Sequence, residues 1–358
     1  MKYDVIERIS AEERTAWSKA RNDAERIAQQ EGFQPIEVFG TGTDRAGTSL
    51  LHQVNEHRKM GRQWKRDLSV LQKGDTLFIQ LPVVNNYFFM QSIMKNLRRR
   101  GVEIIALVHD LETLRMVRDA AVSKRQKIRM RIEEIGVLRQ CSRLIVHNDK
   151  MRDFLMQLGI QVPMTSLGIF DYLVSPSPNG ETIEDLMEKR AAERCDSVIV
   201  AGNLDPQKAG YVYHIPEAIP ADLFGVHYQK TDQKNLRYHG SFPADTLPYE
   251  LSGGFGLIWD GPQPDTCAGP YGEYLRFNNP HKTSLYLAAG FPVIIWKQAA
   301  LAEFVQEKGV GLVVESLDEI PQLIHRLEDQ DYHKIHQNIQ EVSKQIRGGA
   351  YLRAALRG

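Results

Sequence analysis

The segments Asp75-Thr-Leu-Phe-Ile-Gln-Leu81 and Val102-Glu-Ile-Ile-Ala-Leu-Val108 decide the fold. Each is a short run of apolar and β-branched residues that ends before a proline or a polar residue, as buried strands do. Between them, residues 87–100 carry apolar side chains at helical spacing, and Gly101 stands where a helix C-cap favours glycine. Two strands joined by a helix within about thirty residues indicate a parallel sheet covered by helices.

The same alternation extends in both directions along the chain. We expect helices at 16–31 and 151–158 and strands at 35–39 and 143–146. The pattern restarts after residue 185, with strands expected at 196–201, 222–228, 235–240, 256–259, 291–296 and 310–314. Helices are expected at 284–289, 299–308 and 317–327. Two α/β domains, each a doubly wound parallel sheet, are the simplest architecture that fits, with the domains facing a central cleft.

Length and composition agree with two domains. A chain of 358 residues is long enough for two separate cores. Residues 168–185 contain two prolines, two glycines and little periodicity, as an interdomain linker does. We therefore expect an N-terminal domain at 1–167, a linker at 168–185, a C-terminal domain at 186–335 and a C-terminal helix at 336–358.

The formal net charge of zero hides an uneven distribution. Residues 1–165 hold 28 Lys and Arg against 20 Asp and Glu, whereas residues 166–358 hold 17 against 25. The basic residues of 115–143, together with those at 98–100, either face an anionic lipid surface or form a solvated surface without a partner. They are not interleaved with aromatic residues on which bases could stack, so nucleic acid is not expected as a partner.

Several classes of protein are excluded. No apolar run approaches the roughly 20 residues of a spanning helix, so an integral membrane protein is not expected. The first seven residues carry acids where a signal peptide needs an apolar stretch. Three widely spaced cysteines, Cys141, Cys195 and Cys267, favour neither a disulfide framework nor a zinc site. A reducing cytoplasm is therefore the expected compartment.

The segment Asn278-Asn-Pro-His-Lys-Thr-Ser284 is the strongest candidate for a ligand site. Pro280 suits the first turn of a helix, whose free amide groups and positive dipole end attract anions. Lys282 adds a full positive charge, and a diphosphate would fit this combination. The alternative is an ordinary helix start with a solvated lysine. The candidate anion-binding side chains of this segment are Asn278, Asn279, His281, Lys282 and Ser284.

Other candidates follow from the rule that ligands bind beyond the carboxyl ends of parallel strands. Asn203 ends one expected strand, and Lys208 follows it as a second cation for a phosphate, although Gly-Asn after a strand is commonly a simple turn. Gly254 and Phe255 belong to a glycine-rich stretch whose amides could approach a phosphate closely. Neither a nucleotide-triphosphatase loop nor a dinucleotide-binding glycine motif is present.

Asp110 is the best catalytic candidate, because it follows a buried strand and could accept a proton from an acceptor hydroxyl. His109 beside it could orient the acceptor or share the role. The alternative is that Asp110 caps a helix at 111–118. Asp260 and Glu273 form a second pair of carboxylates. The sequence contains no cluster at metal-ligand spacing, so no metal is expected.

Four segments of the second half resemble the bacterial galactofuranosyltransferases, a family similar to the glucosyltransferases that extend glycans on serine-rich-repeat adhesins. They are Phe255-Gly-Leu-Ile-Trp-Asp-Gly261, Thr266-Cys-Ala-Gly-Pro-Tyr-Gly-Glu-Tyr-Leu275, Asn278-Asn-Pro-His-Lys-Thr-Ser-Leu-Tyr-Leu-Ala-Ala-Gly-Phe-Pro-Val293 and Ala299-Ala-Leu-Ala-Glu-Phe304. In the first half, Leu107-Val-His-Asp-Leu-Glu-Thr-Leu-Arg115 and Ser18-Lys-Ala-Arg-Asn-Asp23 look like the family's segments.

The resemblance implies a GT-B fold, in which the C-terminal domain binds a UDP-sugar and the N-terminal domain binds the acceptor. It implies that Lys282 and Lys208 bind the donor diphosphate, that Ser18 and Lys19 contact the acceptor, and that the stretch 336–358 crosses back to the N-terminal domain. Neither a cofactor nor a metal is expected, since cations and a helix end can neutralise the leaving diphosphate. If the sugar is galactofuranose, transfer inverts the anomeric centre and Asp110 is the base.

The favoured function is transfer of a hexose, galactofuranose first, from a UDP-sugar to a glycan or lipid-linked glycan acceptor in cell-surface polysaccharide synthesis. The alternatives are a glucosyltransferase acting on a glycoprotein and a non-catalytic subunit of glycosyltransferase type that only binds. The expected location is cytoplasmic and peripheral to the inner face of the membrane, and self-association stays open.

Overall fold

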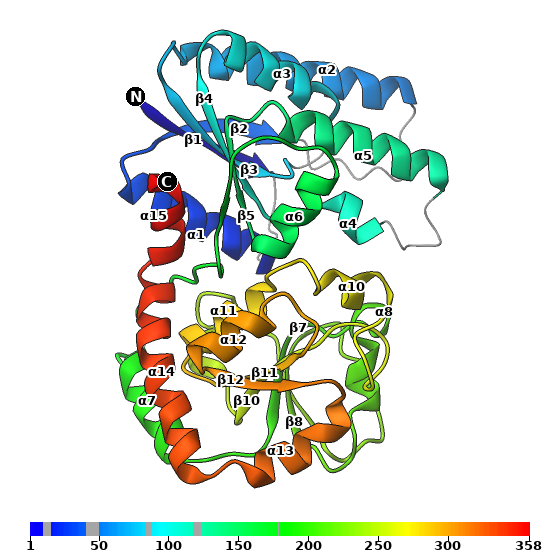
Figure 1. The fold of residues 1–358 in the computed structure, drawn as a ribbon, viewed down its shortest axis with the longest axis vertical. Helices are drawn as coiled ribbons and strands as arrows, with labels where there is room; N and C mark the ends of the chain where they lie inside the picture. Colours follow the sequence, from blue (N-terminus) through cyan, green and yellow to red (C-terminus); the bar gives the residue numbers. More distant parts are fainter. Residues whose placement is uncertain (10–15, 41–49, 84–86, 117–122, 178) are drawn as a thin grey trace. The chain divides into compact units, whose positions relative to one another are not determined.

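The computed structural model describes residues 1–9, 16–40, 50–83, 87–116, 123–177 and 179–358 (Figure 1). The chain divides into two compact units. Unit 1 comprises Met1–Glu13, Ala24–Leu167 and Leu352–Gly358, and unit 2 comprises Arg14–Asp23 and Gly168–Tyr351. Each unit contains one six-stranded parallel sheet with helices packed on it, so the prediction of two Rossmann-like domains is confirmed.

The sheet of unit 1 has the strand order β2-β1-β3-β4-β5-β6, and all its strands are parallel. The strands are β1 (Lys2–Ile9), β2 (Gln34–Gly40), β3 (Thr76–Leu81), β4 (Glu103–Val108), β5 (Arg143–Val146) and β6 (Met164–Ser166). After their first residue β3 and β4 are buried at every position, as central strands covered on both faces must be.

The strand β1 is present in the structure but is not predicted from the sequence. The buried residue Asp4 within this strand explains the omission. Asp4 is fully buried, and neither of its carboxyl oxygens has a hydrogen-bond partner among the described residues. Burial, together with the Glu25 carboxylate, raises the pKa of Asp4 to about 9, so the side chain is uncharged at pH 7. In the sequence an aspartate indicates an exposed, charged position, so the segment around Asp4 does not show the pattern of a buried strand.

The helices of unit 1 alternate with its strands. They are α1 (Ala16–Gln30), which belongs to unit 1 only from Ala24 onward, α2 (Leu50–Asp67), η1 (Leu68–Val70), α3 (Tyr87–Arg99), α4 (Glu112–Met116), α5 (Lys124–Leu138) and α6 (Asp149–Gln157). α2, α3 and α5 pack next to one another along one face of the sheet (Figure 1). They hold five, three and five Lys or Arg residues against two, none and two Asp or Glu residues. The excess positive charge of the first half therefore gathers on these three helices, which we call the basic layer. Within the basic stretch 115–143, residues 117–122 lie outside the described part.

The last helix of the chain, α15 (Ala350–Arg357), contributes its residues from Leu352 onward to unit 1. The Arg143 guanidinium donates to the backbone carbonyl oxygens of Ala355 and Leu356, and Arg357 forms an ion pair with Glu31 at 2.8 Å. α14 (Asp329–Arg347), which precedes α15, belongs to unit 2.

The sheet of unit 2 has the order β12-β11-β10-β7-β8-β9 and is likewise parallel. Its strands are β7 (Val198–Asn203), β8 (Ala221–Val226), β9 (Leu236–Gly240), β10 (Phe255–Ile258), β11 (Val293–Trp296) and β12 (Gly311–Val314). The order reverses between β7 and β10, so the carboxyl ends of these two strands mark the place where open α/β sheets bind ligands.

The other helices of unit 2 surround this sheet. They are α7 (Ile183–Ala192), α8 (Pro206–Ala209), η2 (Gly210–His214), α9 (Leu247–Glu250), α10 (Gly269–Tyr274), α11 (His281–Ala288), α12 (Ala302–Lys308), η3 (Leu317–Glu319) and α13 (Ile320–Arg326). α7 begins inside the expected linker, where Thr182 and Asp185 form a capping box. In the part of the chain that is described, no helix has both the length and the apolar character needed to span a membrane.

Candidate functional site

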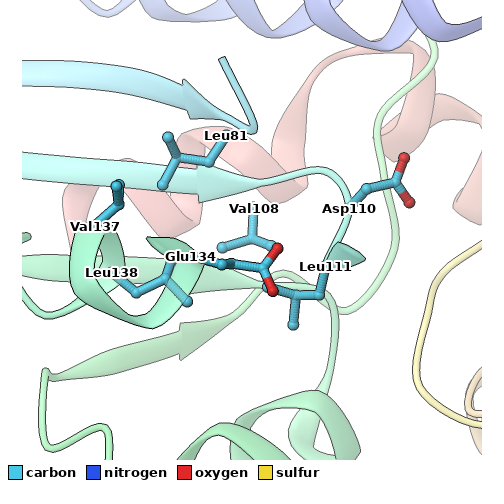
Figure 2. A pocket seen from close by; sticks show the side chains of 7 residues that line it. All are labelled: Leu81, Val108, Asp110, Leu111, Glu134, Val137 and Leu138. Atoms are coloured by element: carbon cyan, nitrogen blue, oxygen red, sulfur yellow. The ribbon is translucent and has the colours of Figure 1, made fainter. Parts of the chain in front are cut away.

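His109 and Asp110 follow β4 at the carboxyl edge of the unit 1 sheet, where the sequence predicts them. The backbone N–H of His109 donates to the Leu81 carbonyl at 2.7 Å, which extends the pairing of β3 with β4 by one residue. Asp110 is half-buried, and Figure 2 shows its carboxylate pointing away from the apolar side chains beside it. The strand thus ends with a carboxylate directed out of the core.

Two histidines fix the backbone before Asp110. The ring Nε2 of His109 lies 2.6 Å from Gln80 Oε1, and the ring Nε2 of His147 lies 3.0 Å from the His109 carbonyl oxygen. Burial lowers the pKa of His147 to about 4, so its ring is neutral at pH 7. Because its partner is a carbonyl oxygen, His147 carries its proton on Nε2 and donates.

Glu134 of α5 fixes the chain after Asp110, and the sequence does not single it out. Its two carboxylate oxygens accept hydrogen bonds from the backbone N–H groups of Glu112 and Thr113, at 2.9 and 3.0 Å. Burial raises the pKa of Glu134 to about 7, although these two bonds act in the opposite direction. In the sequence Glu134 stands within a run of basic residues, where nothing indicates that it is buried.

A narrow cavity, too small for a water molecule, adjoins this carboxylate. Five apolar side chains line it together with Glu134 and Asp110 (Figure 2): Leu81, Val108, Leu111, Val137 and Leu138. The cavity is therefore part of the support of the His109–Asp110 turn and offers no space for a ligand.

In unit 2, Lys282 lies in the first turn of α11, at the carboxyl end of β10. Its Nζ donates to the Trp259 carbonyl at 2.6 Å and forms an ion pair with Asp260 at 3.0 Å. The Lys282 side chain is 16% exposed and that of Asp260 18%. Two of the predicted site residues, Lys282 and Asp260, therefore contact each other at the point where the strand order reverses. Pro280 is the N-cap residue and stands one position before the first turn expected for it.

Lys208 lies beside this pair. Its backbone carbonyl accepts a hydrogen bond from Gly261 N–H at 3.3 Å, and Gly261 directly follows Asp260. The Lys208 Nζ stands 5.8 Å from the ring centre of Tyr271, which is 38% exposed. The backbone of Lys208 therefore lies beside Asp260, at the same edge of the unit 2 sheet as Lys282, while its ammonium stands near Tyr271.

Glu273 lies on α10 and pairs with a third cation, Arg276, at 3.1 Å. The Arg276 guanidinium stacks over the ring of Trp296, the last residue of β11, at 4.6 Å. The sequence does not single out Arg276. A basic residue three positions after Glu273 is the one signal in the sequence that could have pointed to it, although Arg276 lies beyond the end of α10.

Among the other side chains of the 278–284 segment, Asn279 and Ser284 are buried. The amide nitrogen of Asn279 donates to the Gly168 carbonyl at 2.9 Å. Ser284 is fully buried, and its hydroxyl oxygen and the Asn278 amide oxygen are buried without a hydrogen-bond partner among the described residues. Contact of Ser284 with a bound diphosphate does not fit this burial.

His281 and Lys19 meet at one aromatic ring of unit 2, that of Tyr172. His281 stacks on it at 5.0 Å, and Lys19 Nζ lies 4.9 Å from its centre. Desolvation lowers the pKa of His281 to about 4, and its Nε2 lies 3.3 Å from the Asp171 carbonyl oxygen. His281 is therefore neutral at pH 7 and adds no charge to an anion site.

Lys19, on α1, is buried and surrounded by acceptors. Its Nζ lies 2.6 Å from Asp23, 3.1 Å from Asp245 and 2.5 Å from the Leu173 carbonyl oxygen. These three contacts match the three N–H groups of an ammonium. Contact of Lys19 and of the half-buried Ser18 with an acceptor stays a prediction.

Gly254 and Phe255 do not lie with the other candidates. They stand at the amino-terminal end of β10, opposite the carboxyl edge, and Phe255 is fully buried. A Cβ on Gly254 would lie 1.7 Å from the Cys195 carbonyl oxygen, so close backbone packing explains this glycine. A donor-binding role does not fit either residue, because the glycine-rich stretch precedes a strand and does not follow one.

Asn203 ends β7 at the carboxyl edge and is exposed. Its amide oxygen accepts from Asp205 N–H at 3.0 Å and lies 3.1 Å from His227 Nδ1. Among the described residues, no three His, Cys, Asp or Glu side chains are grouped so that they could hold a metal ion. Transfer without a metal stays a prediction.

Comparisons with known proteins give consistent results. Two family models match the chain: "Glucosyltransferase 3-like, N-terminal domain" at residues 2–169 and "Glucosyltransferase 3-like, C-terminal domain" at residues 198–358. The chain is 34% identical over 288 residues to the beta-1,6-galactofuranosyltransferase WbbI of Escherichia coli (strain K12), which covers 80% of this chain and 79% of that protein. It is 24% identical over 343 residues to Glucosyltransferase 3 of Streptococcus gordonii, with 94% and 92% covered.

A solved structure shows the same fold. Sucrose-phosphate synthase from Thermosynechococcus elongatus aligns with 99% of this chain and 98% of its own, at a TM-score of 0.64 and 12% identity. At that identity the likeness concerns the fold alone, and it confirms the GT-B prediction.

Proposed function

The chain belongs to the glucosyltransferase 3-like family of glycosyltransferases, and on that premise we propose that it transfers a hexose from a UDP-sugar to a glycan acceptor. Galactofuranose is the favoured sugar, because the relative named as a galactofuranosyltransferase is 34% identical and the glucosyltransferase of Streptococcus gordonii is 24% identical. The second relative covers more of the chain and supports glucosyl transfer as the alternative, for which we keep a glycoprotein as the proposed acceptor.

The position of Lys282 carries the proposal. Its ammonium is held at the first turn of a helix, beyond the carboxyl end of a central strand, where free amides and a cation attract an anion together. A diphosphate bound there would share Lys282 with Asp260 and receive further positive charge from Lys208. These cations would stabilise the negative charge that develops on UDP as it leaves.

Asp110 is proposed as the general base. Its carboxylate would take the proton of the acceptor hydroxyl while the acceptor oxygen forms a bond to the anomeric carbon. The bond between that carbon and the diphosphate oxygen breaks, and UDP leaves with the electron pair. Attack opposite the leaving group inverts the anomeric centre, as the favoured sugar requires.

We also propose that the basic layer of α2, α3 and α5 contacts an anionic membrane that carries a lipid-linked acceptor. Ile128 and Ile132, one helical turn apart on α5, are 59% and 65% exposed beside the exposed Lys124 and Arg125. Apolar side chains between basic ones favour a lipid surface. Sedimentation with phosphatidylglycerol vesicles should capture the protein, and capture should be lost with phosphatidylcholine and in an Ile128→Glu/Ile132→Glu variant.

A donor screen tests the main proposal. Calorimetry with UDP-galactofuranose, UDP-galactose and UDP-glucose, followed by assays of UDP release, should show binding and turnover of one of them. If the protein is the proposed enzyme, it should show both donor binding and turnover. Binding without turnover of any donor would instead support a subunit that only binds, and absence of binding to all three would overturn the assignment of the donor.

A further inference from the structure

The turn that presents Asp110 is held on both sides by buried groups of its own unit. Before Asp110, the His109 backbone is bonded at its N–H by the Leu81 carbonyl and at its carbonyl by the His147 ring. After Asp110, the backbone N–H groups of Glu112 and Thr113 are both bonded to the Glu134 carboxylate. The direction of the Asp110 side chain therefore depends on both sets of contacts.

Stability alone explains Glu134 poorly. The helix that it caps, α4, extends only from Glu112 to Met116, and a buried carboxylate costs more free energy to desolvate than one helical turn returns. Its surroundings are the apolar side chains of the cavity in Figure 2. A serine or threonine placed before the helix would cap it at lower cost. Glu134 instead provides a rigid connection between α5 and the backbone amides of Glu112 and Thr113, the two residues that follow Leu111.

We propose that Glu134 is a positioning residue for Asp110: by bonding the Glu112 and Thr113 amides it sets the direction in which the Asp110 carboxylate leaves the turn. The proposal rests on the proposed function, in which Asp110 is the base. Because Glu134 faces the cavity and bonds only backbone amides of the turn in the contacts described above, we expect it to affect the turnover step and not donor affinity. The side chain of Leu111, which is buried next to Glu134, also holds the turn in place.

Four variants test this proposal, with UDP release from UDP-galactofuranose or UDP-glucose into water as the assay. Glu134→Leu removes both acceptor oxygens at similar volume, and Glu134→Gln keeps one. Leu97→Ala removes a buried side chain from the same core, outside the cavity lining, and it controls for general loss of stability. Asp110→Asn tests the base assignment in parallel.

We expect Glu134→Leu to lower kcat by about tenfold or more with the donor KM within about twofold. Glu134→Gln should fall between it and the wild type, and Leu97→Ala should keep kcat within about twofold despite a lower melting temperature. A folded Glu134→Leu with wild-type kcat, beside an inactive Asp110→Asn, would overturn the positioning role and leave the proposed function intact. Should Glu134→Leu fail to fold, an unchanged kcat in Glu134→Gln would overturn it equally. Wild-type activity in Asp110→Asn would instead remove the base assignment.

Discussion

The two sheets share one strand architecture, but their carboxyl edges are built from opposite kinds of side chain. In unit 1 the groups that hold the edge are neutral or only partly ionised: the neutral His147 ring, the Gln80 amide, and Glu134, whose pKa of about 7 leaves it about half protonated at pH 7. In unit 2 the edge consists of ion pairs, Lys282 with Asp260 and Arg276 with Glu273. The first arrangement suits handling of a proton, and the second suits binding of an anion.

Removing the proposed base should have the largest effect. Asp110→Asn keeps the shape of the side chain but cannot accept a proton, so kcat should fall by about 10²–10⁴-fold. Because the donor cations lie in unit 2, the Kd for UDP measured by calorimetry should stay within about twofold. A variant that loses UDP binding would contradict the assignment of the two roles to separate edges.

The buried Asp4 gives the second prediction, on stability. The folded chain holds this proton up to a pKa of about 9, whereas the unfolded chain releases it near 3.8. The free energy of unfolding should therefore fall as pH rises between these values, at about 1.4 kcal/mol per pH unit, or roughly 4 kcal/mol from pH 5 to pH 8.

Asp4→Asn cannot ionise and should lack this dependence. Denaturant unfolding of both proteins across that pH range, taken as the difference between them, isolates the aspartate from other titrating groups. Parallel curves for the two proteins would show that Asp4 is ionised in the fold.

The third-largest effect is expected from removing the Lys282 ammonium in the first turn of α11. Lys282→Ala should weaken UDP binding by about 2–3 kcal/mol, since a charge-assisted contact is lost and Asp260 is left to repel the diphosphate. Calorimetry with UDP measures this, with Lys189→Ala on the exposed face of α7 as the control for general charge. Equal affinities in wild type and variant would remove Lys282 from the donor site.

The smallest effect concerns the partner of that cation. Asp260→Asn frees Lys282 from its ion pair and removes a negative charge beside the diphosphate, so UDP should bind several-fold more tightly, by about 1 kcal/mol. Weaker binding would mean that Asp260 holds Lys282 in place more than it competes for it. The double variant with Lys282→Ala should show no such gain.

The central strands could be predicted from the sequence because burial on both faces leaves an unbroken apolar run, as in β3 and β4. The strand β1 could not, since the proton that neutralises Asp4 leaves no trace in the sequence. The positions of Lys282, Asp260 and Lys208 at one strand edge could be predicted because their neighbours along the chain indicate strand ends and a helix start, and their role in binding the donor stays a prediction. Glu134 could not be predicted, because its contacts join residues that are distant in the sequence. Arg276 lies in a segment without a clear pattern. Gly254 was predicted at the carboxyl end of a strand, whereas it lies at the amino-terminal end of β10.

The contrast between uncharged and ionic edges has a consequence for ionic strength. Added salt screens charges that solvent reaches at least in part, and about 0.15 M already shortens their reach to roughly 8 Å. The hydrogen bonds of the neutral His147 ring and the amide of Gln80 carry no net charge to screen. A salt titration should thus raise the donor KM progressively while kcat at saturating donor stays constant, so that simple buffer changes separate the contributions of the two units to one reaction.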